Sequence, residues 1–437
     1  MTKFLFKHID NSGLIVFRII FGLLCALEAF GAIFTGWVKR TLIDPEFTFS
    51  FIGFEWLQPL PDYWMYVYYI IMGLFGLFIM LGFKYRFSML TFALLWTGTY
   101  LMQKSSYNNH YYLLVLLSFI MVIMPANRYA SIDVKLKPSL KSISMPNWCK
   151  WVFVFQLFIL YTYASIAKIY PDWLDTTVIA ILMKSKASYP IIGELLQQTS
   201  VHYILAYGGI LFDGLIIPLL LFKPTRKYAF FASIFFHLFN SIVFQIGIFP
   251  YMSLAFSLFF FEPKVIRNIF LKRKSLYKAN EISIPKHKTI MLSLFSIYFL
   301  IQIALPIRHH FIQDNVLWTE EGHRLSWRMM LRSKSGRTKY TIINAETNAV
   351  IPFRIDDYLT KKQQRGAKSK PDVIWQFAQH LKKEFAEKGI TIKVFVKSYV
   401  SINGKPKKQL IDPNVDIANE EWHHFKHHSW ILPSEDN

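Results

Sequence analysis

One lysine in this sequence occupies a setting suited to acid-base chemistry. About twenty mostly apolar residues from Trp151 onward lead into Lys168, and Pro171 then prevents a helix from continuing. A segment of this length predicts a membrane span with Lys168 at or just inside its end, where an ammonium is costly to desolvate. A neutral amine there could act as a base. The structural alternative is a lysine that extends to the lipid headgroups.

Further polar side chains stand at the ends of apolar segments or inside them. Asn108, Asn109 and His110 begin an apolar run, and on the topology below they share a membrane face with Lys168. His110 could be catalytic or an aromatic-belt anchor. His237 and Asn240, three residues apart, share one helix face and could bind a ligand or a neighbouring helix. Asp213 is a buried carboxylate to which the sequence assigns no role.

Composition bounds the class of protein. The chain has 437 residues, 53% hydrophobic and 17% aromatic, with a formal net charge of +21. Residues 1–308 hold 28 Lys and Arg against 13 Asp and Glu, whereas residues 309–437 hold 21 against 15. The excess charge therefore belongs to the apolar part, where basic loops set membrane orientation, and it does not indicate a nucleic-acid partner. These data predict a polytopic membrane protein in contact with lipid.

Nine spans are predicted, at about residues 14–38, 63–82, 87–103, 110–125, 150–169, 203–222, 228–246, 249–262 and 289–307. The first contains Arg18 and Glu28, for which structural and functional roles are both open. With the N-terminus inside, the inner segments carry nineteen Lys and Arg and the outer segments six. We therefore expect a cytoplasmic N-terminus and residues beyond about 308 on the outer face.

The C-terminal portion has a different pattern. Residues 327–332, 339–344 and 350–355 have strand-like content, and the last two flank a turn at Glu346, as in a hairpin. Apolar residues recur every four positions between Pro371 and Gly389, which predicts a helix, and residues 391–402 predict another strand. The expected fold is an all-α bundle of about nine transmembrane helices, residues 1–308, with a small mixed α+β extramembrane domain, residues 309–437.

Several motifs, in the same order along the chain, resemble the vitamin K-dependent gamma-glutamyl carboxylases. In the apolar part they are Asn108 to Leu113, Ser131 to Asp133, Ile166 to Lys168 with Asp172 and Trp173, Gly208 to Asp213, Phe236 to Ser241 and Ile246 to Tyr251. In the C-terminal part they are Leu325 to Met330, Val400 to Gly404 and Asp412 to Asp416. Motifs spread over nearly the whole chain make this resemblance specific.

The resemblance implies a mechanism. A reduced naphthoquinone, vitamin K hydroquinone, is deprotonated by a neutral lysine and reacts with O2, and the resulting strong base removes a γ-proton from a glutamyl side chain, which then captures CO2. The family's lysine falls on Lys168, and the histidine that assists carbanion formation falls on His110. Substrate or quinone binding is expected at Asn108, Asn109, His237, Asn240, Asp172 and Trp173. No metal is expected, and the histidines at 423, 424, 427 and 428 fit an exposed tail better than a metal site.

Some features depart from the family. Vertebrate members continue beyond the point where this sequence ends and carry an outer-face disulfide that Cys25 and Cys149, both in or near apolar segments, cannot supply. The chain is therefore expected to be bacterial, in the inner membrane, with a periplasmic C-terminal domain and an exported Glu-containing protein or peptide as partner. Two alternatives stay open: a quinol epoxidase that does not carboxylate glutamate, and a non-enzymatic membrane scaffold with the same fold.

Overall fold

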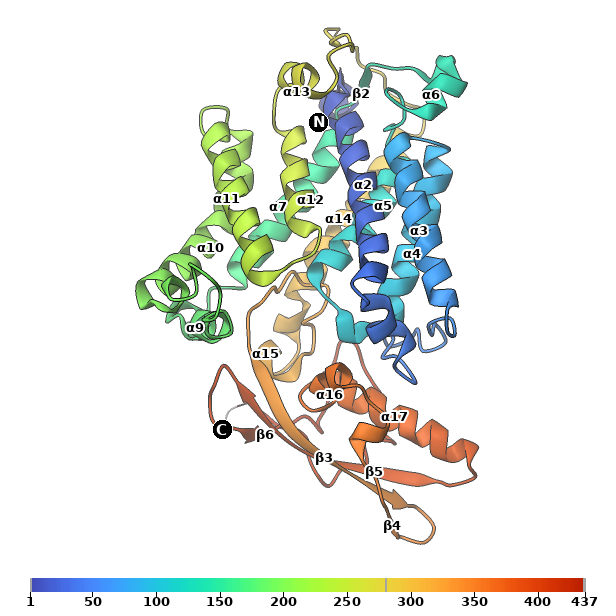
Figure 1. The fold of residues 1–437 in the computed structure, drawn as a ribbon, viewed down its shortest axis with the longest axis vertical. Coiled ribbons are helices and arrows are strands. Elements are labelled where there is room, and N and C mark those ends of the chain that lie inside the picture. Colours follow the sequence, from blue (N-terminus) through green and yellow to red (C-terminus); the bar gives the residue numbers. More distant parts are fainter. Residues whose placement is uncertain (1, 280, 435–437) are drawn as a thin grey trace.

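The computed structural model describes residues 2–279 and 281–434, and a helical bundle forms the larger part of it (Figure 1). Each predicted span coincides with a helix. These helices are α2 (Ser12–Phe34), α3 (Trp64–Leu81), α4 (Tyr85–Met102), α5 (Asn109–Ile123), α7 (Trp148–Ile166), α10 (Thr199–Leu221), α11 (Arg226–Phe244), α12 (Phe249–Ala255, continued by a 3₁₀ turn at Phe256–Phe259) and α14 (Lys288–Ile307). The predicted fold class, a membrane helix bundle with a small strand-containing domain, is confirmed.

Six of the described helices are long and apolar enough to cross a membrane: α2, α3, α7, α10, α11 and the segment Lys288–Phe311 that contains α14. Helices α5 and α12 are apolar but shorter. The chain is therefore an integral membrane protein, whereas the total of nine spans stays a prediction.

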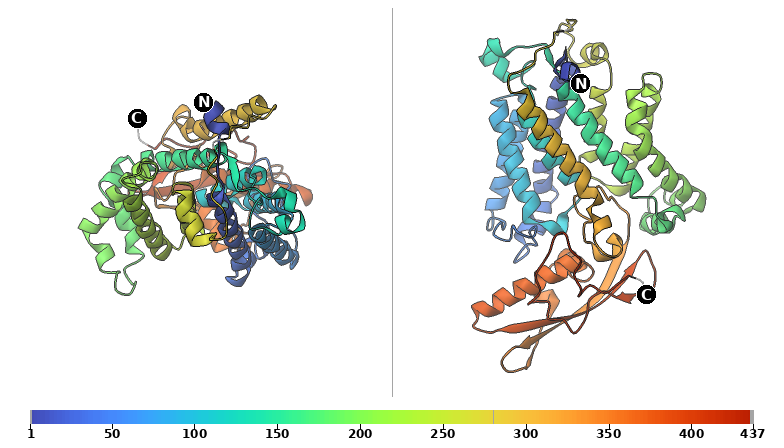
Figure 2. Two further views of the ribbon diagram at one scale, coloured as in Figure 1. Left: turned by 90° about the horizontal axis from the view of Figure 1, so that it is seen from above. Right: turned by 180° about the vertical axis from the view of Figure 1, so that it is seen from behind.

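The two ends of the bundle differ. At one end lie α1 (Thr2–Phe6), the two-stranded sheet of β1 (His8–Asp10) and β2 (Ser144–Pro146), α6 (Ile132–Leu136) and α13 (Pro263–Phe270) (Figure 1). At the other end lie α9 (Thr177–Lys184) and the C-terminal domain, as the view from behind also shows (Figure 2). The segments predicted to face the cytoplasm thus gather at the end opposite the C-terminal domain, as an odd number of spans requires.

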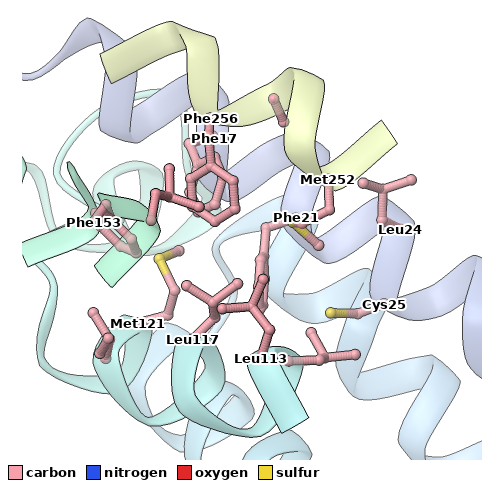
Figure 3. Close-up of a cluster of buried hydrophobic side chains, with 14 of the residues drawn as sticks. Phe17, Phe21, Leu24, Cys25, Leu113, Leu117, Met121, Phe153, Met252 and Phe256 are labelled. Carbon is pink, nitrogen blue, oxygen red and sulfur yellow. The ribbon is translucent and has the colours of Figure 1, made fainter. Parts of the chain in front are cut away.

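Buried hydrophobic side chains, aromatic and aliphatic, form the centre of the bundle, and Figure 3 shows a cluster of them. Phe17 on α2 packs against Phe153 on α7 and Phe256 after α12, with ring centroids 5.3 and 4.9 Å apart. Helices α2 and α3 cross closely because of glycine: a Cβ on Gly22 would lie 2.3 Å from the backbone nitrogen of Met80. Small residues permit such close helix crossings in membranes.

Arg18 has a structural role. Its guanidinium is fully buried and donates hydrogen bonds to the backbone carbonyls of Met80, Ala126, Tyr129 and Ala130. These carbonyls lie at the C-terminal end of α3 and in the loop after α5, where helix ends leave acceptors without an internal partner. Arg18 therefore joins three segments at the end of the bundle away from the C-terminal domain.

The C-terminal domain is built on a four-stranded antiparallel sheet with strand order β4-β3-β5-β6. Its strands are β3 (Lys334–Asn344), β4 (Val350–Ile351), β5 (Ile392–Ile402) and β6 (Lys408–Gln409), and its helices are α15 (Val316–Thr319), α16 (Lys361–Ala367) and α17 (Pro371–Glu387). Buried apolar residues of α17, among them Phe377 and Leu381, share a core with Val394 and Val396 of β5. The predicted hairpin, helix and final strand are confirmed.

The strand predicted at residues 327–332 is wrong. This segment is irregular, and Leu325, Trp327 and Met330 have φ values of +60°, +58° and +53°. A strand needs strongly negative φ. Trp327 instead packs into the membrane bundle against Tyr112, with ring centroids 4.9 Å apart, and is fully buried. Tertiary packing against the bundle has overridden the local strand preference.

The sidedness of the membrane can be tested by labelling. A cysteine at Lys383, an exposed position on α17, should react with an impermeant thiol reagent added to intact spheroplasts, because the positively charged loops hold the opposite end of the bundle in the cytoplasm. A cysteine at exposed Lys272 should react only after lysis. Cys25 and Cys149 are buried and serve as the unlabelled background. The opposite labelling pattern would invert the proposed orientation.

Candidate active site

Lys168 lies where α7 ends, at the end of the bundle nearer the C-terminal domain. The helix stops at Ile166, and the chain turns at Pro171 into the short helix α8 (Pro171–Leu174). The Lys168 side chain folds back on its own helix and donates a hydrogen bond of 3.2 Å to the carbonyl of Ala164. Only 8% of the residue is exposed, so its amine points into the protein and does not extend freely to the membrane surface.

Asp213 on α10 is the partner of this amine. Its Oδ2 accepts a hydrogen bond from Lys168 Nζ, and both side chains are buried. Gly209 on α10 lies beside the lysine, since a Cβ there would be 4.0 Å from Lys168 Cε, an ordinary van der Waals distance. The sequence shows that Asp213 is a carboxylate inside an apolar segment, but it does not show that Asp213 pairs with Lys168.

Trp173 and Asp172, two further predicted site residues, lie on α8 and have different roles. Lys168 Nζ lies 5.6 Å from the Trp173 ring centroid, and the indole nitrogen donates to the carbonyl of Ala206. Trp173 thus covers the amine. Asp172 instead accepts a 2.9 Å hydrogen bond from Asn403 and forms a 2.8 Å ion pair with Lys405 of the C-terminal domain. Its carboxylate therefore holds that domain beside the lysine.

His110 borders a cavity of about 140 Å³. The cavity lies between the first turns of α5 and the loop from α11 to α12, and its walls include Asn108, Leu114, Gln245 and Phe249. The imidazole stacks on the Phe249 ring, with centroids 3.9 Å apart. Asn108 contributes to the wall while its side-chain oxygen caps α5 at the nitrogen of Tyr111. Cavities of this volume hold about one aromatic ring or a short side chain.

A chain of contacts leads from this cavity toward Lys168. Phe249 also contacts the ring of His237, whose Nε2 is 3.2 Å from the hydroxyl of Tyr161. The Tyr161 ring in turn contacts that of Phe212, the residue before Asp213, with centroids 6.2 Å apart. In the described part of the chain, no hydrogen bond or ring contact joins Lys168 directly to His110. The two predicted catalytic residues thus belong to neighbouring sites connected through α7 and α11.

Asn109 and Asn240 are engaged in structural contacts. Asn109 donates to the carbonyl of Arg328 at 2.9 Å and accepts from the hydroxyl of Tyr107, so it ties α5 to the irregular segment that carries Trp327. Asn240 donates to the carbonyl of Phe236 on its own helix. Their contribution to a binding site stays a prediction.

Two groups of buried charges hold the segment between α14 and β3, and one of them also reaches the bundle through Lys104. Glu320 pairs with Arg332 and, at 3.5 Å, with Lys334. Burial alone would raise the pKa of Glu320, but the adjacent Arg332 and Lys334 outweigh it and hold the pKa well below its usual range. A second group joins Asp372 to Lys104 and Arg324. These groups fix the segment between α14 and β3 beside the two sites.

The C-terminal histidines do not form the wholly exposed tail expected from the sequence. His428 is 4% exposed and its Nδ1 lies 2.6 Å from Glu321, and His427 bonds the same carboxylate at 2.8 Å. His423 and His424 are exposed. Within residues 2–279 and 281–434, no group of three or more His, Cys, Asp or Glu side chains is arranged to hold a metal ion.

Comparison with known families agrees with this architecture. The HTTM domain family matches residues 6–264, more than half of the chain, and the vitamin K-dependent gamma-carboxylase lumenal domain matches residues 287–437. No solved structure matches the chain. The first match covers Lys168, Asp213 and His110, and the second covers the domain that docks beside them. The chain therefore belongs to the vitamin K-dependent gamma-carboxylase family, with an HTTM membrane domain followed by the lumenal domain.

Proposed function

We propose that the protein couples oxygenation of a reduced naphthoquinone to its epoxide with carboxylation of glutamyl side chains in an exported protein or peptide. The observation that carries this proposal is the burial of Lys168 against Asp213 at the end of an apolar helix. The family match supports the carboxylating chemistry. The epoxidation and the identity of the substrate are our inferences.

The pair formed by Lys168 and Asp213 gives the lysine a way to act as a base. An ammonium beside a carboxylate and an amine beside a carboxylic acid contain the same number of protons. We infer that in this dry site the proton can pass from the ammonium to the carboxylate, because two charges are expensive to bury. Lys168 can therefore present a neutral amine to the quinol without exchanging a proton with solvent, and Trp173 excludes water from it.

The cavity beside His110 fits the second half of the reaction. Its volume of about 140 Å³ suits a glutamyl side chain, and the apolar part of its wall, which includes Leu113, Leu114 and Phe249, would limit the access of water to a carbanion. The lumenal domain is held beside this end of the bundle by Asp172 and Asn109, which supports a role for it in presenting the peptide. Its balance of 21 basic against 15 acidic residues favours an acidic substrate.

The experiment uses one detergent-solubilised preparation supplied with reduced naphthoquinone, O2, labelled bicarbonate and a Glu-containing peptide. We expect quinone epoxide and acid-stable label in the peptide. Epoxide without labelled peptide, across several Glu-containing peptides, would favour the quinol epoxidase. The absence of both products would favour the non-enzymatic scaffold.

Replacing His110 by alanine should separate the two products. If His110 acts at the carbanion step, epoxide formation persists while carboxylation falls by about 10² to 10⁴, the usual contribution of one acid-base group. The measurement is the ratio of labelled peptide to epoxide. His424→Ala, at an exposed histidine of the lumenal domain, is the control and should leave the ratio unchanged. An equal loss of both products in His110→Ala would instead assign His110 to placement of the quinol.

A further inference from the structure

The sheet of the lumenal domain packs against α17 with only one of its two faces. Strands β3 and β5 contain 11 residues each and pair along their whole length. Successive side chains of a strand point to opposite faces of a sheet. Side chains at even positions, such as Ile342 and Val394, are buried in a core that they share with α17. Side chains at odd positions therefore form the opposite face, which α17 does not cover.

This uncovered face is strongly basic. Its cations and aromatic rings, which together we call the basic face, are Arg337, Lys339, Lys393, Phe395, Lys397 and Tyr399. Strands β3 and β5 together contain five Lys and Arg and no Asp or Glu. In the part of the chain that the structure describes, none of the four cations of the basic face forms an ion pair. A positive surface of this kind attracts an anionic partner.

The register of the strands places two of these charges directly against each other. Lys339 on β3 is the cross-strand partner of Lys397 on β5, and Arg337 is the partner of Tyr399. Like charges directly opposite each other weaken a sheet. A carboxylate bound between Lys339 and Lys397 would offset this repulsion, so the basic face is stabilised when an anion is bound.

The basic face points away from the membrane. Helices α16 and α17 lie between the sheet and the bundle (Figure 1). Gln376 of α17 donates a 3.0 Å hydrogen bond to the carbonyl of Ser50, in the connection between α2 and α3. Lys362 of α16 donates one of 2.8 Å to the hydroxyl of Ser106, between α4 and α5. The opposite face of the sheet is therefore in water, which favours a soluble anionic partner over lipid headgroups.

An extended acidic peptide fits the spacing of these charges. Alternate residues of a strand lie about 7 Å apart, and alternate residues of an extended peptide have the same spacing. Carboxylates at alternate positions of such a peptide can thus meet Arg337 and Lys339 in turn. Phe395 and Tyr399 stand on either side of Lys397 and offer apolar contact to the stems of long side chains.

We propose that the basic face docks an extended acidic segment of the exported substrate, remote from the glutamate that is carboxylated. This role rests on the proposed function. Helix α17, about 10–12 Å across with its side chains, separates the basic face from the bundle, so the docked segment and the glutamate in the His110 cavity are different parts of one chain. Docking raises the local concentration of the glutamyl segment at the cavity. It lowers the KM for substrates that carry the acidic segment and leaves kcat unchanged.

Binding can be measured without turnover. The probe is a fluorescein-labelled peptide in which Asp alternates with Ser, and the readout is its fluorescence anisotropy with detergent-solubilised protein. Lys339→Gln with Lys397→Gln keeps polar side chains on the sheet and should raise the Kd about threefold or more, because two charge contacts are lost. Lys361→Gln with Lys383→Gln removes the same charge from exposed positions of α16 and α17 and is the matched control. At physiological salt the Kd of this control should change less than about twofold, because exposed charges more than about 8 Å apart are screened.

Carboxylation kinetics test whether the docked segment belongs to the substrate. Two substrates share one Glu-containing peptide and a flexible linker, and they differ in a tail of alternating Asp and Ser or of alternating Asn and Ser. Wild-type protein should have a KM about threefold or more lower for the Asp tail, with the same kcat. In Lys339→Gln with Lys397→Gln this advantage of the Asp tail should be lost, and higher salt should reduce it in wild-type protein.

The outcomes are distinct. Loss of peptide affinity and of the KM advantage in Lys339→Gln with Lys397→Gln, but not in the control, supports docking on the basic face. Equal affinity of wild-type protein and this variant, or equal KM values for the two tails, overturns it while the proposed function stands. A protein that binds the Asp peptide but forms neither epoxide nor labelled peptide overturns the proposed function, and with it the assignment of the segment to a substrate. If the variant, in nanodiscs of phosphatidylcholine, loses binding to phosphatidylglycerol vesicles but keeps the wild-type affinity for the peptide, the basic face is a lipid contact and the proposal is wrong.

Discussion

Lys168→Ala protein should form neither quinone epoxide nor carboxylated peptide, because deprotonation of the quinol precedes both products in the proposed reaction. Loss of a general base typically lowers a rate by about 10² to 10⁴. Truncation also leaves Asp213 buried without its partner and opens space beside Trp173. Small primary amines should enter this space and restore part of both activities. The measurement is epoxide and labelled bicarbonate in peptide, from one solubilised preparation.

Two comparisons separate loss of the base from loss of the fold. Lys184→Ala removes an exposed lysine at the end of α9 and should leave both products unchanged. Asp213→Asn keeps a hydrogen-bond acceptor for Lys168 but removes the negative charge, so it should fold and lose part of both activities together. Wild-type amounts of epoxide from a well-folded Lys168→Ala protein would contradict the proposed role of the lysine. That result would favour the hypothesis of a non-enzymatic membrane scaffold.

The pairing of Lys168 with Asp213 shows where prediction from the sequence ends. Long apolar runs predict each helix, since length and hydropathy are local properties of the chain. A contact between residues 45 positions apart depends instead on the rotation of α7 and α10 about their axes, which local patterns do not determine. The lysine could therefore be identified as a candidate base, whereas its partner appears only when the helices are packed.

The same limit applies to the site around His110. The position of the histidine at the start of an apolar run predicts that it lies near the outer end of a helix, and α5 begins at Asn109. The cavity beside it requires the loop between α11 and α12, more than a hundred residues later. The strand predicted around Trp327 is the clearest error of the sequence analysis. The apolar residues there suggested a strand, but positive φ angles bend the segment so that Trp327 packs against the bundle.

Asp372→Asn should detach or destabilise the lumenal domain, and this is the second large effect that we expect. Asp372 lies in the first turn of α17, with Oδ2 at 2.7 Å from Lys104 Nζ and 2.6 Å from Arg324 Nη1. The side chains of Asp372 and Lys104 are 3% and 2% exposed. Asparagine would leave the buried Lys104 and the partly buried Arg324 without a counter-charge, which costs about 3–5 kcal/mol. Thermal unfolding in detergent and limited proteolysis after Arg308 should both report this loss.

The pH dependence provides a second measurement of the same contact. Burial alone would raise the pKa of Asp372, but Arg324 and Lys104 outweigh it and hold the pKa well below its usual range. The unfolded chain therefore binds this proton at higher pH than the folded one, so the stabilisation is complete above about pH 4 and is lost as the pH falls below it. Wild-type protein should lose stability below about pH 4 more steeply than Asp372→Asn.

Two variants make the expectation at Asp372 specific. Asp357→Asn, at an exposed carboxylate of the same domain, should change the free energy of unfolding by less than about 0.5 kcal/mol. The double variant Asp372→Asn with Lys104→Met removes one of the two cations left without a counter-charge. It should be more stable than Asp372→Asn alone, because an apolar side chain at that buried position needs no partner. If Asp372→Asn unfolds like wild-type protein at neutral pH, the buried charges do not hold the lumenal domain, and its position beside Lys168 must depend on Asp172 and Asn109 instead.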